Sequence, residues 1–360
     1  MEKKYQIVID AVEKWINIGK YQANDKLPTE SELMNMFNVS RHTVRKSLSD
    51  LETKGVVYRI QGGGTFVAEE KRGTNAFTDN QIIAVLTTHI NDYIFPSIIS
   101  GIESELSRKS ISLTLSSTQN NEDVERKELL KLLNGGINGL IVEPTKSAFN
   151  LKNFDLYDEL IKSGLPIITI NSHPAQLNIP YFVMDDFRGG QVATEYLLHH
   201  NHTNILGIFK TDDQQGIDRM NGFTDEMQRS QLTSNAANLL FQSGDSKQRI
   251  SQHLLDCLSS SNRPTAIICY NDQVAVITYN LAVSLGMRIP QDLSIIGFDN
   301  STLSHSFGIQ LTSIDHPKDK MGHDAAGLMI KMLDNPTKDY STNSEIYRPI
   351  IIEGDSVVKI

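Results

Sequence analysis

The segment 27–68 constrains the fold of this chain most, because two short helix patterns there are followed by two strand patterns around three glycines. Thr29 and Glu32 have the spacing of a capping box, in which each side chain satisfies a free backbone N–H at a helix start. Apolar residues then recur at three- and four-residue spacing, and Asn38 can end the helix in a left-handed conformation. Ser40 is the expected N-cap of a second helix.

The second helix is expected to bury an apolar face made of Val44, Leu48 and Leu51. Its open side carries residue types that read DNA grooves, namely Arg41, His42, Arg45, Lys46 and Ser49. We expect Gly55 to close this helix and strands to follow at 56–60 and 65–68. The tip between the strands, 61–64, has few side chains and can enter a minor groove. Two helices and such a hairpin predict a winged helix-turn-helix.

The motifs LPTESEL, VSRHTVRKSL and GGGTFV stand in the order and at the spacing of the GntR family of bacterial regulators, which this segment resembles. The resemblance implies that Arg41, Thr43 and Arg45 contact phosphates and base edges. It also implies that Glu30 orients them. Arginine can bond guanine O6 and N7 together, and hydroxyls fix the register on phosphate oxygens. The residues predicted to bind DNA are Lys4, Glu30, Ser40, Arg41, His42, Thr43, Arg45, Gln61, Gly62 and Gly63. A solvated basic helix is the alternative.

The charge of the chain differs between its two ends. Residues 1–72 hold twelve Lys or Arg and ten Asp or Glu, whereas the whole chain has a net charge of −9, which leaves −11 for the remainder. Phosphate repels an acidic surface, so only the N-terminal segment is expected to touch DNA.

The length of 360 residues suits a winged helix of about 70 residues and a larger, two-lobed domain. We expect the DNA-binding domain at 1–68, a polar linker at 69–80 and the second domain at 81–360. Cys257 and Cys269 have no CxxC partner, which disfavours disulfide and zinc roles. No apolar run approaches the roughly 20 residues of a membrane helix. A soluble cytoplasmic protein without metal, cofactor or membrane contact is expected.

The second domain alternates apolar runs with amphipathic stretches. The runs that read as parallel strands buried on both faces are 82–88, 112–118, 139–144, 166–171, 205–210, 266–271 and 294–299. Stretches between them, such as 96–109 and 272–285, are long enough for crossover helices, which predicts an α/β fold with two lobes and parallel sheets. Polar residues stand where strands end, namely Glu143, Asn171, His173, Asn271 and Asp299. Ligands bind at the carboxyl ends of such strands, so these side chains are expected to converge on one cleft.

The second domain resembles the sensor domain of the LacI/GalR family, which is akin to periplasmic sugar-binding proteins, through the motifs DRMNGF, YND, IIGFDN and LTSIDHP. The resemblance places four residues where the family contacts sugar: Arg219, Asn271, Asp299 and His316. The further lining residues that it implies are Glu143, Lys146, Asn171, His173, Gln215 and, on a nearby loop, Asp185. Tyr93 and Phe95 are expected to cover the apolar face of a pyranose or, alternatively, to be core aromatics.

The combination of a GntR head with a LacI-type sensor is similar to the bacterial arabinose-responsive repressors. This similarity implies a repressor that leaves operator DNA when L-arabinose binds. A homodimer is expected, with one winged helix on each half of a pseudo-palindromic operator. Carboxylate acceptors beside Arg and Asn donors suit a neutral polyol, whereas a phosphorylated ligand would call for several more cations.

Alternatives remain for the ligand and for the class of protein. A regulator of the same architecture that senses another pentose or a nucleoside fits the same residues. An enzyme with a fused DNA-binding head would need a larger catalytic domain and a Schiff-base lysine, and neither is evident. A periplasmic carrier is disfavoured by the winged helix and by the lack of a signal peptide pattern.

Overall fold

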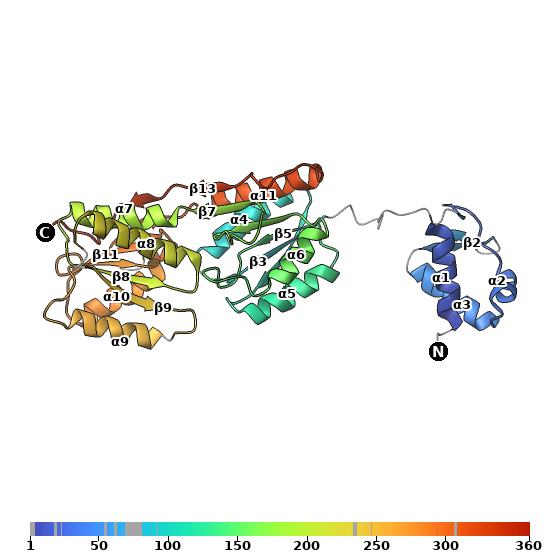
Figure 1. Cartoon of the computed structure of the whole chain (residues 1–360), viewed down its shortest axis with the longest axis horizontal. Coiled ribbons are helices and arrows are strands. Elements are labelled where there is room, and N and C mark those ends of the chain that lie inside the picture. Colours follow the sequence, from blue (N-terminus) through green and yellow to red (C-terminus); the bar gives the residue numbers. More distant parts are fainter. Residues whose placement is uncertain are drawn as a thin grey trace. The chain divides into compact units, whose positions relative to one another are not determined.

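The computed structural model describes residues 4–17, 20–22, 24–53, 56–60, 63–68, 81–91, 93–232, 236–245, 247–305 and 308–360. The chain divides into two compact units, residues 1–80 and residues 81–360 (Figure 1). The expected linker at 69–80 lies outside the described residues, as do Gly55, Gln61 and Gly62.

The smaller unit is the winged helix that the sequence predicts. Its elements are α1 (Lys4–Asn17), α2 (Glu30–Phe37), α3 (Arg41–Thr53) and the antiparallel strands β1 (Val57–Ile60) and β2 (Gly64–Val67). The capping box of Thr29 and Glu32 is present at the start of α2, and Asn38 ends that helix with a φ of 49°. Both predicted helix boundaries are therefore confirmed.

The core of the winged helix includes a helix that the sequence patterns did not predict. Val44, Leu48 and Leu51 of α3 are buried as expected. They share their cluster with Ile9 and Val12 of α1. Most of the apolar face of α3 is thus covered by α1, which leaves the opposite side of α3 open to a partner.

The first lobe of the larger unit is built on a parallel sheet with the strand order β13-β7-β6-β5-β3-β4. Its strands are β3 (Ile82–Thr87), β4 (Ser112–Ser117), β5 (Gly139–Val142), β6 (Ile167–Ile170), β7 (Tyr181–Met184) and β13 (Glu345–Tyr347). Its helices are α4 (Phe95–Ser107), α5 (Glu122–Asn134), α6 (Phe154–Lys162) and α11 (Lys318–Asp334). α4 and α11 pack in one core cluster, and α5 and α6 pack in another (Figure 1).

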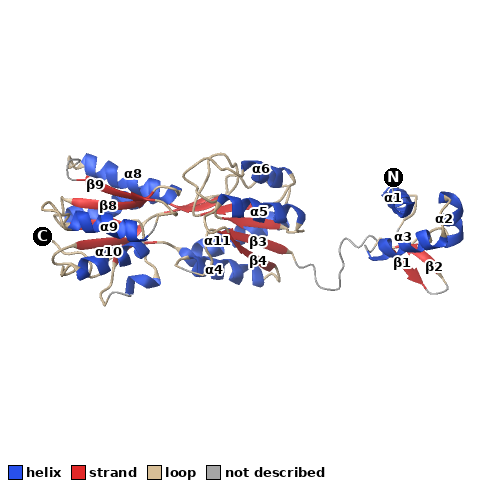
Figure 2. Cartoon of the chain, turned by 90° about the horizontal axis from the view of Figure 1, so that it is seen from below, coloured by secondary structure: helices blue, strands red, loops and turns tan. Residues whose placement is uncertain are grey.

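The second lobe repeats this plan with the strand order β14-β12-β11-β10-β8-β9, in which only the edge strand β14 is antiparallel. Its strands are β8 (Ile205–Lys210), β9 (Ala236–Phe241), β10 (Ala266–Cys269), β11 (Ser294–Asp299), β12 (Thr312–Asp315) and β14 (Ile350–Ile352). Its helices are α7 (Asp186–His199), α8 (Gln214–Arg229), α9 (Lys247–Leu258), α10 (Asp272–Ser284) and the 3-10 turn η2 (Thr302–His305). Figure 2 shows helices flanking both sheets.

The two lobes are joined by the segments between β7 and α7, between β12 and α11, and between β13 and β14, since each pair divides between the lobes. The chain thus has the predicted fold, a winged helix followed by a two-lobed α/β unit with parallel sheets. The seven predicted strands are all present, with ends that differ by up to two residues. The strands β9, β13 and β14 were not predicted.

Candidate ligand cavity and DNA-binding surface

The open side of α3 carries a basic group held by a carboxylate of α2. Nε of Arg45 donates to both carboxylate oxygens of Glu30, over 3.1 and 3.0 Å, and Nε of Arg41 lies 4.0 Å from the same carboxylate. Both arginine side chains are about 60% exposed. The Ser40 hydroxyl accepts from the backbone N–H of Thr43 and so caps α3 as predicted. Glu30 therefore fixes the direction of Arg45, which matches the orienting role that the GntR resemblance implies.

The other residues predicted to bind DNA lie around this group. His42 is exposed in the first turn of α3, and Gly63 precedes β2 at the hairpin. Lys4 is the first residue of α1, but its side chain lies outside the described residues. The contact of each of these residues with DNA stays a prediction.

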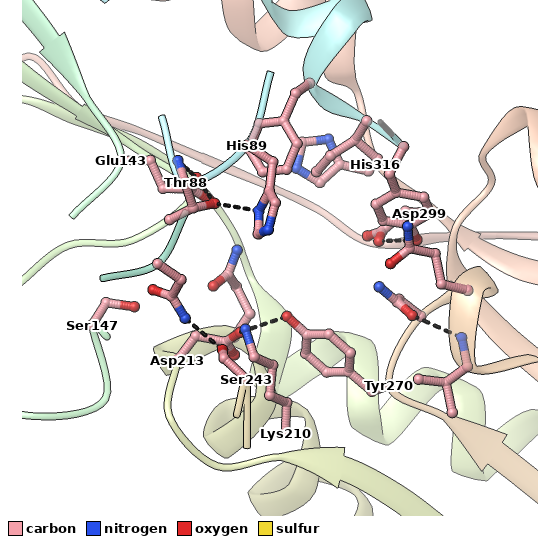
Figure 3. A pocket seen from close by; sticks show the side chains of 18 of the residues that line it. Thr88, His89, Glu143, Ser147, Lys210, Asp213, Ser243, Tyr270, Asp299 and His316 are labelled. Atoms are coloured by element: carbon pink, nitrogen blue, oxygen red, sulfur yellow. Dashed lines mark hydrogen bonds and ion pairs between the residues drawn. The ribbon is translucent and has the colours of Figure 1, made fainter. Parts of the chain in front are cut away.

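A cavity of about 230 Å³, here called the effector cavity, opens between the two lobes at the carboxyl ends of their strands. Eight of the predicted residues line it: Tyr93, Phe95, Glu143, Gln215, Arg219, Asn271, Asp299 and His316. Lining residues that we did not predict include Thr88, His89, Asn120, Ser147, Lys210, Asp213, Phe241, Ser243, Tyr270 and Gln273. Figure 3 shows that Tyr270 and Lys210 face Thr88 and Glu143 across the cavity.

Arg219 forms the buried polar centre of the cavity on the side of the second lobe. Its Nε donates to Asp186 over 2.7 Å, and its two terminal nitrogens donate to the Tyr270 carbonyl over 2.7 Å and to Asp299 over 3.4 Å. The guanidinium also lies 4.4 Å from the ring centre of Phe298. Burial raises the pKa of Asp186 to about 7, although the charge of Arg219 opposes this shift. Arg219 is thus held in place by the protein. Nε and both terminal nitrogens already donate to protein groups, so little of the donor capacity of Arg219 is left for a ligand.

Lys210 forms a second buried ion pair at the end of β8. Its Nζ lies 2.9 Å from Asp213 and 3.7 Å from Asp212. The hydroxyl of Tyr270 donates to the same Asp213 carboxylate over 2.6 Å. Burial opposes the charge on Lys210, but the two carboxylates outweigh it and raise the pKa of the amine. The lysine therefore stays protonated and its charge is balanced within the protein.

Glu143 belongs to a hydrogen-bonded group in the first lobe. It accepts from the backbone N–H of Thr88 over 2.9 Å and from the side-chain amide of Asn171 over 2.9 Å. Asn171 Oδ1 in turn lies 3.2 Å from Nε2 of His316. Burial raises the pKa of Glu143, while burial lowers the pKa of His316 to about 4. His316 is therefore a neutral ring at pH 7.

Tyr93 connects the two lobes rather than offering only an aromatic face. Its hydroxyl donates to the Asp299 carboxylate and lies 2.9 Å from the Phe298 carbonyl, and it accepts from the backbone N–H of Asp272. Phe95 is 7% exposed and packs in the core cluster of the first lobe while touching the cavity. Phe95 is thus partly a core aromatic, and the contact of either ring with a sugar stays a prediction.

The expectation of one shared cleft is wrong for Lys146, Asn171, His173 and Asp185. Lys146 has a φ of 47° in a turn, and its Nζ lies 3.9 Å from Glu122, away from the effector cavity. Asn171 directly follows β6 and donates to Glu143, but it does not itself line the effector cavity. Asn171, His173 and Asp185 instead line a second cavity of about 360 Å³, here called the hinge cavity. It is bounded by 171–173, Tyr181, 183–187, Gln214, Gln215, Asp218 and Ile346.

The rule that located Glu143 and Asp299 also applies to the residues that sequence analysis missed. Lys210 is the last residue of β8, and Tyr270 directly follows β10. A charged or aromatic residue at the end of an apolar run is therefore as informative as an amide or a carboxylate at that position. Thr88 directly follows β3, so it is also a polar residue at the end of an apolar run, although its side chain is small.

The described part of the chain offers no group of three or more His, Cys, Asp or Glu side chains arranged to hold a metal ion. Within the same residues, no helix combines the length and the apolar character needed to cross a membrane.

Comparison with known proteins identifies both units. Residues 4–67 match the bacterial regulatory proteins of the gntR family, and residues 194–357 match the periplasmic binding protein-like domain. The larger unit is similar to the crystal structure of a LacI family transcriptional regulator from Enterococcus faecium with bound ribose, at 26% identity and a TM-score of 0.67. That match covers 78% of this chain and all of that chain.

Two curated relatives match both units together. The arabinose metabolism transcriptional repressor of Geobacillus stearothermophilus is 37% identical over 99% of this chain and 98% of its own length. That of Halalkalibacterium halodurans is 39% identical over 100% of this chain and 98% of its own length. The chain therefore belongs to the family of these transcriptional repressors, in which a GntR-type winged helix precedes a LacI-like sensor of sugars.

Proposed function

We propose that this protein represses genes of arabinose metabolism and leaves its operator when L-arabinose fills the effector cavity. The observation that carries the proposal is the match to two repressors of arabinose metabolism along nearly the full length of both chains, DNA-binding head and sensor together. The protein acts as a homodimer on operator DNA in the cytoplasm, and it works by binding rather than by catalysis.

The charges in the effector cavity support a neutral sugar. Lys210 is paired with Asp213, and Arg219 is paired with Asp186 and Asp299, so both cations already have partners. A phosphate group would have to displace one of these carboxylates and would meet the others at close range. A sugar hydroxyl both donates and accepts, so it can bond to a carboxylate and to an amide without disturbing either pair.

Release from DNA follows if L-arabinose favours one arrangement of the two lobes. A ligand shifts such an equilibrium only by its difference in affinity for the two states. Groups from both lobes line the cavity, so a sugar bonded to Glu143 and to Asn271 would bind most tightly when the lobes are close. Closure would move the segments that join the lobes, near 183–186 and 311–316.

D-ribose is the second candidate effector, because the similar LacI family structure contains ribose. Calorimetric titration of the protein with L-arabinose, D-ribose, D-xylose and adenosine decides between the candidates. We expect L-arabinose to bind most tightly and to release a DNA fragment carrying the operator in a gel-shift assay. Preferential binding of ribose or adenosine would replace the effector and leave the repressor assignment in place.

Gln215→Ala tests whether the effector cavity is the sugar site, with Gln228→Ala as the matched control. Gln215 lines the cavity in the first turn of α8, and Gln228 is exposed near the end of the same helix. Loss of one hydrogen bond to the sugar should weaken L-arabinose binding about three- to tenfold, since such a bond contributes roughly 0.5–1.5 kcal/mol. Equal sugar affinity in both variants would argue against this part of the site.

A further inference from the structure

The hinge cavity lies where the chain passes between the lobes. Its walls come from β7 and the start of α7, which joins the lobes, and from the first turn of α8. Only Gln215 also lines the effector cavity, so the two spaces are separate. The group formed by Asn171, His316 and Glu143 stands between them.

The charge of the hinge cavity is negative. Asp185, Asp186 and Asp218 line it, and its lining residues, all of them described, include no lysine or arginine. Asp186 is bonded to Arg219 over 2.7 Å, and the cations that act on Asp185 and Asp218, which are Arg188 and Arg219, lie outside the lining of the cavity. Burial raises the pKa of Asp218, and the nearby charge of Asp185 adds to this shift. A positively charged ligand would relieve the repulsion between these two carboxylates.

The lining of the hinge cavity also includes apolar and aromatic side chains. Phe187 is 40% exposed and Ile346 is 54% exposed, although both are large hydrophobic side chains. Tyr181 lies beside them, with its ring stacked on His173 at a centroid distance of 3.8 Å. The wall therefore has apolar surface that a ligand of moderate size can cover.

Two polar atoms of residues that line the hinge cavity have no hydrogen-bond partner among the described residues. The hydroxyl oxygen of Ser172 is buried and has no hydrogen-bond partner among the described residues. The residue as a whole is 3% exposed. Nδ1 of His173 is also buried and has no hydrogen-bond partner among the described residues. Buried polar atoms without a partner are uncommon in folded proteins, and here both belong to residues that line the hinge cavity.

The hinge cavity is connected to the effector cavity by bonded side chains. Asp186 holds Arg219, which reaches Asp299 in the effector cavity. On the other side Asn171 donates to Glu143, which lines the effector cavity. A ligand that moves Asp186 or Asn171 therefore changes the groups that we propose to meet the sugar.

We infer that the hinge cavity is a second ligand site, which takes a small organic ammonium compound with its charge at Asp185 and Asp218 and its apolar body against Phe187 and Ile346. Such a ligand would sit against the segment that moves when the lobes change their arrangement. Binding there would modulate the response to the sugar without competing for the same space.

Benzylammonium, benzyl alcohol and benzoate form a probe series of nearly equal shape and different charge. Calorimetry and ligand-observed NMR with the full chain at pH 7.5 should show one benzylammonium per chain, bound about tenfold more tightly than benzyl alcohol, with benzoate weakest. Benzylammonium should remain bound in the presence of saturating L-arabinose. Equal binding of the alcohol and the ammonium compound would overturn the inference, as would displacement of benzylammonium by L-arabinose.

Asp218→Asn gives the matching test in the protein. The asparagine amide oxygen can still accept the hydrogen bond from Gln214. The substitution therefore removes the charge, and we expect the fold to be kept. Benzylammonium should bind about fivefold or more weakly, and benzyl alcohol should be unaffected. Asp225→Asn, which removes a carboxylate from α8 outside the cavity, should leave both affinities unchanged. An unchanged benzylammonium affinity in Asp218→Asn refutes the site, and if that variant does not fold, the probe series decides alone. The comparisons of benzylammonium with benzyl alcohol do not need L-arabinose to be the effector, and only the competition with L-arabinose rests on the proposed function.

Discussion

Replacing Arg219 by alanine should destabilise the larger unit more than any exposed ion pair would. The guanidinium side chain is 4% exposed and is bonded to Asp186 and Asp299. Removing one partner of a buried pair costs about 3–5 kcal/mol, because the remaining charges stay buried without compensation. For a unit of this size each kcal/mol corresponds to roughly 2–4 °C, so the melting temperature should fall by roughly 10 °C or more.

The loss should also depend on pH. With Arg219 present, burial raises the pKa of Asp186 from its ordinary value to about 7. The native state therefore binds more protons than the unfolded chain between about pH 4 and 7, and this group costs stability as the pH rises through that window. Without Arg219 the pKa of Asp186 rises further, which extends the window above pH 7. The destabilisation caused by Arg219→Ala should be larger at pH 8.5 than at pH 6.

Scanning calorimetry of the full chain at both pH values measures this effect, with Arg188→Ala as the control. Arg188 is bonded to Glu195 on the same helix, but its side chain is 42% exposed. Its loss should cost about 1 kcal/mol or less and should not differ between the two pH values. The single tryptophan, Trp15, reports on the smaller unit separately by fluorescence. The reasoning fails if both variants lose the same stability, or if the cost of Arg219→Ala does not change with pH.

Two further predictions concern DNA binding and helix packing. Arg45→Ala should weaken operator binding by roughly 1–3 kcal/mol in gel-shift assays at fixed salt, while calorimetry should find sugar binding unchanged; an unaltered operator affinity would remove Arg45 from the base-reading set. Gly322→Ala should destabilise the protein by about 1–3 kcal/mol, because a Cβ there would lie 2.1 Å from the Ile98 carbonyl oxygen. Gly327→Ala on the same helix has open space and should be neutral or slightly stabilising, so equal melting temperatures for the two variants would contradict the close packing of α4 against α11.

The sequence predicts strands well where burial on both faces makes them continuously apolar. β5 and β10 are fully buried and were predicted on that ground. β13 and β14 were not, because each has only three residues and exposed side chains, which is too short for an apolar run to be recognised. Helix α1 was not predicted, because no Ser, Thr, Asp or Asn precedes Lys4 to mark its start, although its apolar residues have helical spacing.

The strand-end rule predicts which residues lie near the junction of the lobes, but it does not predict which of the two cavities each residue lines. Glu143 and Asp299 follow their strands into the effector cavity. Asn171 also follows its strand, but it lines the hinge cavity, where His173 stacks on Tyr181. Left-handed backbone does not decide between the two cavities, because Asn171 has a φ of 62° and Asp299, which lines the effector cavity, has a φ of 89°.

Hydrogen bonds of the protein itself hold the two lobes together. These bonds affect the fraction of molecules in which the lobes are close before the sugar binds. Across the cavity, Nδ2 of Asn120 donates to the Ser243 hydroxyl over 2.6 Å, and the Ser147 hydroxyl accepts from the backbone N–H of Gln214 over 3.1 Å. Each such bond contributes roughly 0.5–1.5 kcal/mol, so together they bias the lobes towards contact by a few kcal/mol at most. Apparent sugar affinity is the intrinsic affinity reduced by the fraction of molecules that are competent to bind. Weakening either bond should therefore lower the apparent affinity even where no atom that touches the sugar has changed, and the sensitivity of the repressor depends on the contacts between the lobes as much as on the cavity lining.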